Sequence, residues 1–146
     1  MITFQADVTR STKALDNPVR FALAGNAIFT LVSKSTGTRF TYRVQVAKDN
    51  ESLHFVSVLT GPDNTNDYAY LGIIRRGVFF RTAKSRIALD APSHKAFDWF
   101  WRLAACGAEI KSAEIFHEGR CGRCGRALTV PESIASGFGP ECIGKL

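Results

Sequence analysis

The chain has 146 residues, of which 45% are hydrophobic, 22% charged and 11% aromatic. These values exclude a disordered, collagen-like or disulfide-dense protein, and the length fits one domain with at most a small appendage. The formal net charge of +6 favours acidic partners, nucleic acid above all. No apolar run approaches the roughly 20 residues that span a bilayer, and the first residues lack the apolar stretch of a secretory signal. We therefore expect a cytoplasmic protein with reduced thiols and no membrane contact.

The first part of the chain, residues 1–25, shows no sustained hydrophobic period. Within it, Asn17 and Pro18 form a turn signal, because proline fixes its own φ and biases the preceding residue away from the helix. We expect a loosely structured N-terminal arm over residues 1–25, with one short strand near residues 2–4.

A β pattern occupies the chain from Ala27 to about Thr82. Residues Arg39–Ala47 alternate between apolar and polar side chains, as in a half-buried strand. Residues 53–59 are more uniformly apolar, as in a central strand covered on both faces, and residues 75–77 have the spacing of a tight hairpin. Together they predict an antiparallel meander, either open or closed into a small barrel, of about five strands at residues 27–33, 39–47, 53–59, 68–74 and 78–82.

An aromatic-rich helix is predicted next, with Asp90 or Ser93 as its cap and Gly107 just past its end. Its apolar stripe, suited to covering the sheet, consists of Phe97, Phe100, Trp101 and Ala104. Residues 108–116 fit either a strand or a short helical turn, and residues 131–136 fit a short helix. The fold class is therefore α+β, divided into an arm (1–25), a β domain with its covering helix (26–107) and a C-terminal module (108–146).

The cysteines place the chemistry in the C-terminal module. Cys121 and Cys124 form a C-x2-C pair with a glycine after each cysteine, and Cys142 ends a Gly-Phe-Gly-Pro-Glu-Cys segment. The glycines let the backbone turn so that several sulfurs face one ion, and a redox pair ordinarily lacks the third cysteine. Three thiolates at this compact spacing predict a structural Zn²⁺ in a tail that is like a zinc knuckle or treble clef.

A tetrahedral zinc needs a fourth ligand. His117, in an H-x3-C arrangement with Cys121, is the first candidate. Cys106, at the end of the predicted helix, is the second, and a water molecule is the third. If His117 completes the shell, Cys106 is left as a thiol of the core.

A resemblance to a known family rests on five segments of the sequence, namely GNAIFTLVSKSTGTRFTYRV, FVSVLTGPDN, YLGII, KSRIALDAPSHKAFDWFW and HEGRCGRCGRALTVPESIASGFGPEC. Through them the chain from about Gly25 onwards resembles a family of small uncharacterised proteins of bacteriophages and mobile elements. The last segment is the most specific. The resemblance implies a zinc-binding tail on Cys121, Cys124, Cys142 and His117 and a phage-linked, intracellular setting. It implies no activity, and residues 1–25 lie outside it.

Two groups of basic residues indicate where an acidic partner would bind. One lies within the acid-free residues 75–86 and consists of Arg75, Arg76, Arg81, Lys84 and Arg86. The other surrounds the first two cysteines and consists of Arg120, Arg123 and Arg126. Four aromatic side chains near the first group can stack on unpaired bases, namely Tyr68, Tyr70, Phe79 and Phe80. At most two of them can face away from the core. We therefore expect a protein that binds DNA or RNA, single-stranded or without sequence preference.

Two other interpretations compete with nucleic-acid binding. One is a phage protein-interaction factor that binds and inhibits or redirects a host or defence protein. The other is a solvated basic edge that only deters strand pairing. Enzymatic activity is not expected, because the sequence shows no nucleophile beside a base. His54 fits a hydrogen-bonded core or edge position, and His94 is expected to face solvent.

Overall fold

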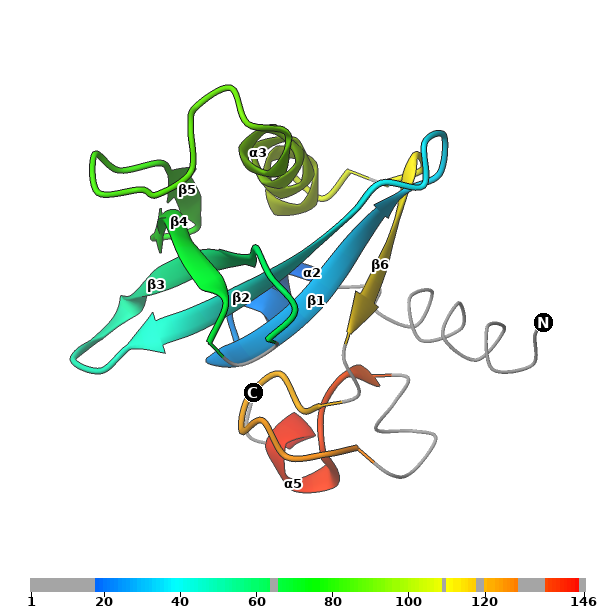
Figure 1. Ribbon diagram of the computed structural model, residues 1–146. Coiled ribbons are helices and arrows are strands. Elements are labelled where there is room, and N and C mark those ends of the chain that lie inside the picture. Colours follow the sequence, from blue (N-terminus) through cyan, green and yellow to red (C-terminus); the bar gives the residue numbers. More distant parts are fainter. Residues whose placement is uncertain (1–17, 64–65, 109, 118–119, 129–135, 145–146) are drawn as a thin grey trace.

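The computed structural model describes residues 18–63, 66–108, 110–117, 120–128 and 136–144. Within these residues, six strands form one antiparallel sheet in the order β5-β4-β3-β2-β1-β6, curved into a half-barrel around α3 (Figure 1). The strands are β1 (Asn26–Ser33), β2 (Arg39–Ala47), β3 (Asn50–Leu59), β4 (Tyr68–Arg75), β5 (Val78–Phe80) and β6 (Ala113–His117). The helices are α2 (Pro18–Ala22), α3 (Pro92–Ala105) and α5 (Pro140–Ile143). None of these described helices has the length and apolar character needed to cross a membrane.

The predicted α+β class and antiparallel meander are confirmed, and the sheet is open. The first five strands follow one another across the sheet in chain order. β6 adds a sixth strand by pairing with β1, from Phe29 opposite His117 to Ser33 opposite Ala113. The segment that fitted either a strand or a helical turn is therefore an edge strand, and it leads directly towards the cysteines.

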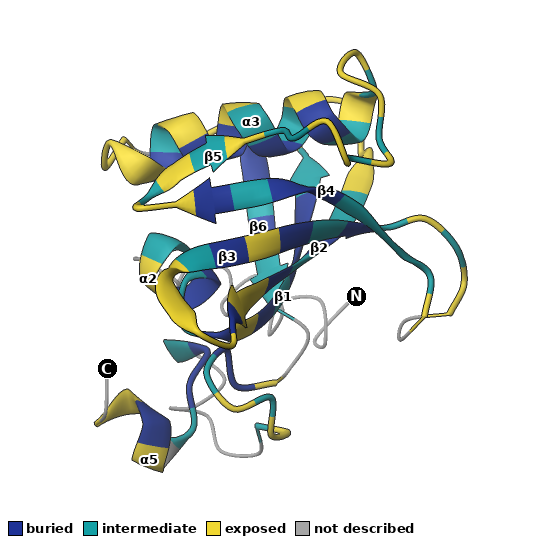
Figure 2. Cartoon of the chain, turned by 90° about the vertical axis from the view of Figure 1, so that its left-hand side faces the viewer, coloured by how far each residue is buried: buried dark blue, intermediate teal, exposed yellow. Residues whose placement is uncertain are grey.

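β3 departs from its prediction as a strand covered on both faces. His54, Val56 and Val58 are buried, whereas Phe55 between them is 42% exposed, so burial alternates along the strand (Figure 2). The prediction was wrong because only the face towards α3 is packed at this position. We call that face the inner face and the opposite one the outer face.

The predicted hairpin between β4 and β5 is confirmed. Arg75 pairs with Val78, so the turn consists of Arg76 and Gly77, whose φ values are 51° and 82°. Two consecutive left-handed residues define the turn type whose twist suits a two-residue hairpin. The Trp101 indole donates a hydrogen bond of 2.9 Å to the Gly77 carbonyl, which fixes this hairpin to α3.

The inner face and α3 form the core. The predicted apolar stripe of α3 is buried, and the Phe97 ring centroid lies 4.8 Å from that of Phe79 and 5.0 Å from that of Tyr42. The helix begins after Ala91, with Pro92 in the first turn and no side-chain cap, so neither Asp90 nor Ser93 caps it. Proline supplies the start, because its missing N–H needs no partner there.

The two core histidines are both buried. His54 Nε2 donates to the Leu23 carbonyl at 3.1 Å, as its predicted hydrogen-bonded position requires. His94 also is buried, and its Nδ1 donates to the Leu89 carbonyl at 2.9 Å. The expectation that His94 faces solvent was wrong, because the loop before α3 folds back over the first turn.

Residues 18–25 belong to the folded domain. Phe21 and Ala22 of α2 are buried, and the Phe21 ring centroid lies 6.5 Å from that of Phe29. The expectation of a loosely structured arm was therefore wrong for residues 18–25, and the rest of the expected arm, residues 1–17, lies outside the described residues. Pro18 begins the helix, since proline is tolerated in the first turn as well as in a turn. The strand expected near residues 2–4 lies outside the described residues.

Candidate metal centre and basic surfaces

The first two cysteines lie in a tight loop that directly follows β6. Residues 120–128, here called the knuckle, are closed by an antiparallel bridge between Arg120 and Ala127. The Cys121 amide donates to the Arg126 carbonyl at 2.8 Å, and the Gly125 amide donates back to the Cys121 carbonyl at 2.9 Å. Gly125 has a φ of 78°, which lets the chain reverse after Cys124.

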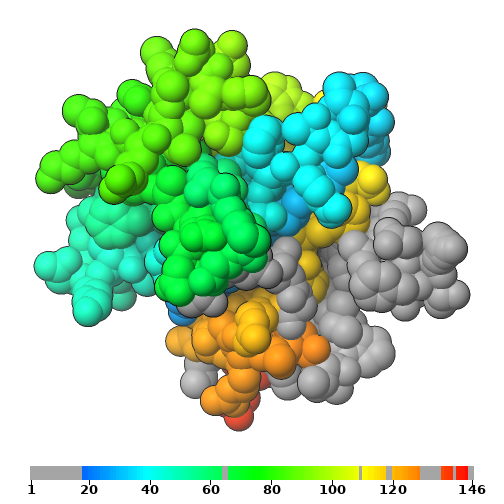
Figure 3. Space-filling model, in the orientation of Figure 1, coloured from blue at the N-terminus to red at the C-terminus, as the bar shows by residue number. Residues whose placement is uncertain are grey.

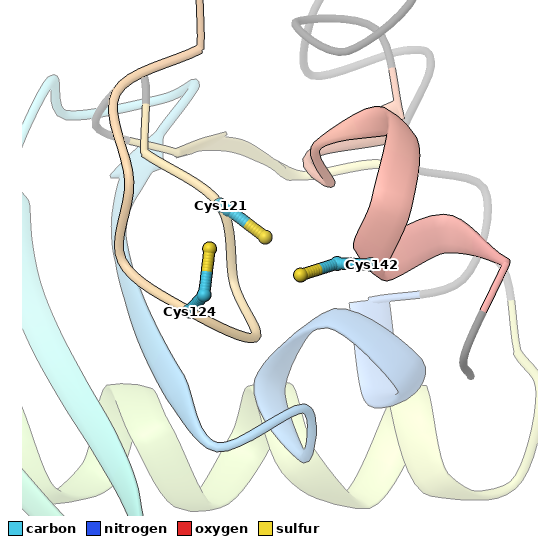
Figure 4. Close-up of side chains that lie close together, drawn as sticks. All are labelled: Cys121, Cys124 and Cys142. Carbon is cyan, nitrogen blue, oxygen red and sulfur yellow. The ribbon is translucent and has the colours of Figure 1, made fainter.

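The third cysteine comes from α5, and the three side chains point towards one another (Figure 4). The sulfur atoms of Cys121, Cys124 and Cys142 all lie within 4.8 Å of one another. A Zn–S bond of about 2.3 Å in tetrahedral geometry separates thiolates by roughly 3.8 Å, so a slight contraction would bring these sulfurs around one ion. The three cysteines can therefore hold a metal ion. The helix expected over residues 131–136, between the two halves, lies almost wholly outside the described residues.

Hydrogen bonds prepare the cluster unevenly for ionisation. Burial raises the pKa of Cys121, but hydrogen bonds from the amides of Gly139, Cys124 and Arg123 outweigh it and lower that pKa to about 7. For Cys142, the Arg123 guanidinium lowers the pKa, but burial and the neighbouring thiols together raise it above its usual value. One thiolate thus forms readily near neutral pH, whereas full ionisation needs a cation in the cluster.

Neither candidate for the fourth ligand lies in the group of three sulfurs. His117 ends β6, and its ring centroid is 5.9 Å from that of Phe21. Cys106 is exposed at the end of α3, where its thiol donates to the Leu103 carbonyl at 3.4 Å. The expectation of a core thiol at Cys106 was wrong, because the residue follows the buried stripe of α3 instead of continuing it. His117 as a zinc ligand stays a prediction.

The knuckle is attached to α2 and to the start of β1. The Asn26 amide donates to the Gly122 carbonyl at 2.8 Å, and the Asn26 side chain donates to the Arg123 carbonyl at 2.9 Å. Phe21 lies against Gly122, and its ring centroid is 5.7 Å from that of Phe138. The cysteine cluster is therefore supported by the core and is not an independent appendage.

The contact between Gly122 and Phe21 leads to a first prediction. A Cβ atom at Gly122 would lie 2.7 Å and 2.8 Å from two ring carbons of Phe21. We expect Gly122→Ala to lower the free energy of unfolding by about 1–3 kcal/mol, the cost of overpacking a core. Gly139→Ala is the matched control, because a Cβ there meets nothing within 4 Å. Urea unfolding measures both, and equal stability of the two variants would contradict this packing.

The two predicted basic groups lie at different ends of the sheet. On the β4–β5 hairpin and the loop after it, most of the basic side chains are exposed, namely Arg75, Arg76, Lys84 and Arg86. Arg81 is half-buried and donates from Nε to the Ile87 carbonyl at 2.8 Å. In the knuckle, Arg120 and Arg126 are exposed, whereas Arg123 is half-buried and donates to the Cys142 sulfur at 3.5 Å. The space-filling view shows the knuckle at the surface, below the sheet (Figure 3).

The predicted stacking residues divide between the two faces. Phe79 packs on the inner face against Phe97 and His94, and is thus part of the core. Phe80 is 49% exposed, and the Tyr70 hydroxyl lies 3.0 Å from that of Thr82. Tyr68 lies under the Arg43 guanidinium, 4.3 Å from it. Phe55 is also exposed on this sheet, and the sequence does not indicate it, because the apolar run around Phe55 conceals the alternation that exposes it.

The fold is that of an α+β protein, and its C-terminal part carries a cluster of three cysteines that could hold a metal ion. Residues 111–146 match a model of a family of unknown function, DUF6011. The matched region contains β6 and all three clustered cysteines, so the chain is similar to this family where its candidate metal centre lies. No curated protein and no solved structure matches the chain.

Proposed function

We propose that the protein binds nucleic acid, DNA or RNA, in single-stranded form or without sequence preference, and that a structural zinc ion stabilises it. The observation that carries this proposal is the exposed basic hairpin. Residues 68–89 contain five basic residues and no acid, and four of the five side chains are exposed. A concentrated positive charge of this kind is the electrostatic footprint of a phosphate backbone.

The identity of the metal is proposed from the chemistry of the donors. A set of three thiol sulfurs, with one thiol already inclined to ionise, suits zinc better than a hard cation, which prefers oxygen. We propose that Cys121, Cys124 and Cys142 bind Zn²⁺ with His117 as the fourth ligand. Reorientation of the His117 side chain would be needed, because its ring faces Phe21. The zinc is assigned a structural role, joining the knuckle to α5.

Removing the charge of the hairpin provides the test. We expect the double variant Arg75→Ala with Arg76→Asn to bind a fluorescent single-stranded oligonucleotide more weakly than the unmodified protein does. Its slope of log affinity against log salt concentration should be smaller in magnitude by roughly 1–2. Asparagine is chosen at position 76 because it tolerates the left-handed backbone there. Fluorescence anisotropy between about 50 and 200 mM salt measures the effect.

The matched control removes two charges elsewhere. Lys34 and Lys95 are exposed and lie off the hairpin, so Lys34→Ala with Lys95→Ala should leave the affinity nearly unchanged. If the unmodified protein binds neither single strands nor duplex at about 50 mM salt, nucleic-acid binding is wrong. A protein partner that is retained from host extract after nuclease treatment would then support the protein-interaction alternative.

The cellular setting is part of the same proposal. The resemblance to phage and mobile-element proteins supports action in the cytoplasm of a host cell. We propose a binding protein and not an enzyme, because the buried His54 and His94 each use a ring nitrogen on a backbone carbonyl. Those bonds assign both histidines to the core.

A further inference from the structure

One row of side chains crosses the outer face of the sheet from its β5 edge to the knuckle. The strand registers place Phe80 opposite Ile73, Ile73 opposite Phe55, Phe55 opposite Gln45, and Gln45 opposite Asn26. Residues paired in this way project from the same face of a sheet. In Figure 2 the strands follow one another from β5 at the top to β1 and the knuckle below.

This row is aromatic at the β5 end, and its two phenylalanines are open to solvent. Phe80 is 49% and Phe55 is 42% exposed. The ring centroid of Tyr70 lies 6.4 Å from that of Phe55, at the side of the row. Exposed apolar side chains near an edge strand favour aggregation, so natural sheets usually carry polar or charged residues there. Phe55 and Phe80 are not needed for packing, because nothing described covers them, and polar residues would serve better at these positions. Their exposed rings therefore favour a role in contacting a ligand.

Basic residues lie at both flanks of the row and at its knuckle end. Arg75 lies two residues beyond Ile73 towards the hairpin, on the same face, and Arg43 pairs with Ser57, which is opposite Tyr70. At the far end, the Asn26 side chain is bonded to the carbonyl of Arg123 in the knuckle. The row therefore connects the two basic groups, over four strand spacings or about 19 Å.

The exposed rings and the flanking arginines together indicate the chemical class of the ligand. Flat apolar rings bordered by arginines complement a polyanion whose flat apolar groups are accessible, which describes unpaired bases on a phosphodiester backbone. A duplex keeps its bases stacked inside and offers only phosphates to such a surface. Phe55 and Phe80 lie two strands apart, roughly 10 Å, so each ring faces a different base.

We propose that this row is the binding track for single-stranded nucleic acid, with Phe55 and Phe80 as its stacking residues. The bound nucleic acid crosses β5, β4, β3 and β2 and reaches Asn26 at the start of β1, beside the knuckle. The inference rests on the proposed function and makes it specific: it names the face, the stacking residues and the form of nucleic acid. The bond from Asn26 to Arg123 makes the knuckle the far end of the track.

The test uses the zinc-loaded full chain and labelled oligothymidylate or oligouridylate of about 16 nucleotides. We expect Phe55→Ala and Phe80→Ala each to weaken binding about 5- to 100-fold, the range for losing one stacked base. The salt dependence should stay as in the unmodified protein, because no phosphate contact is lost. Phe55→Tyr and Phe80→Tyr should restore most of the affinity. Leu89→Ala, at a residue that is 66% exposed outside the sheet, is the matched control and should have no effect.

The outcomes separate this inference from the proposed function. If both alanine variants bind like the unmodified protein while the Arg75, Arg76 double variant binds weakly, the track is wrong and nucleic-acid binding stands. Equal affinity for a duplex of the same length would also overturn the track. If the unmodified protein binds neither the single-stranded oligonucleotides nor the duplex, both proposals fail. A preference for oligothymidylate or for oligouridylate shows whether DNA or RNA is the ligand.

Discussion

Cys121→Ser is expected to abolish zinc binding. Cys121 is fully buried, and its sulfur lies between the other two thiols and the amides that lower its pKa to about 7. Serine shortens the side chain and replaces the thiolate with a hydroxyl, a poor zinc ligand near neutral pH. Metal analysis of the purified protein should show about one zinc per chain before the change and almost none after it.

Loss of the metal should also destabilise the C-terminal module. Apparent binding energies of structural zinc reach about 10–16 kcal/mol in small zinc peptides, and part of that energy holds the module folded. We expect protease to cut the variant first in residues 118–146, and we expect a chelator to make the unmodified protein behave in the same way. Cys106→Ser is the comparison variant and should keep its zinc, because this exposed thiol lies outside the group of three sulfurs and the fourth position is assigned to His117. Full zinc content in Cys121→Ser would contradict the assigned ligands.

The fourth ligand can be identified in the same series. With cobalt in place of zinc, the absorption spectrum reports the number of thiolates and the coordination geometry. His117→Ala should lower the metal affinity if the imidazole completes the shell. An unchanged spectrum and affinity in His117→Ala, with a change in Cys106→Ser, would instead assign Cys106. No change in either variant would leave water in the fourth position.

Phe21→Ala is expected to affect both stability and metal retention. Phe21 is 2% exposed and contacts Gly122, which follows Cys121, and Phe138, four residues before Cys142. Removing a buried phenylalanine ordinarily costs about 3–5 kcal/mol of unfolding free energy. The cavity would also lie directly under the knuckle, so we expect faster loss of zinc to a competing chelator.

Phe97→Ala is the comparison that gives this experiment its meaning. Phe97 of α3 is fully buried against Phe79 and Tyr42, and its replacement by alanine should cost a similar ~3–5 kcal/mol of unfolding free energy. It lies in the part of the core away from the knuckle, so zinc retention should stay close to that of the unmodified protein. Equal zinc loss in the two variants would mean that global stability, and not the contact with Phe21, controls the metal site.

The sequence predicted the parts of the fold whose signals are local. The alternation in Arg39–Ala47, the turn at Arg76 and Gly77 and the stripe of α3 each follow from neighbouring residues. The structure confirms the turn and the stripe, and it confirms the alternation as far as Gln45, after which Val46 is exposed at a register shift. The pairing of β6 with β1 depends on residues far apart in the chain, and no local pattern specifies it. The five-residue helix α2 is too short to show a helical period.

Part of the candidate site was also predictable from the sequence. The spacing of Cys121, Cys124 and Cys142 and the glycines beside them predicted that the three sulfurs meet, and the structure brings them together. The exposure of Phe55 could not be predicted, because it depends on α3 covering one face of β3 and not the other. The track from Phe80 to Asn26 likewise exists only through the registers of five strands.

The most direct test of the account is a map of amide chemical-shift changes when a single-stranded oligonucleotide is added to the isotope-labelled, zinc-loaded protein. The account predicts that the largest changes fall on the outer face, around Phe55, Ile73 and Phe80, on the hairpin at Arg75 and Arg76, and at the knuckle near Asn26. Amides of α3 should change little. An absence of changes, or changes confined to α3 and the β1–β2 hairpin, would contradict it.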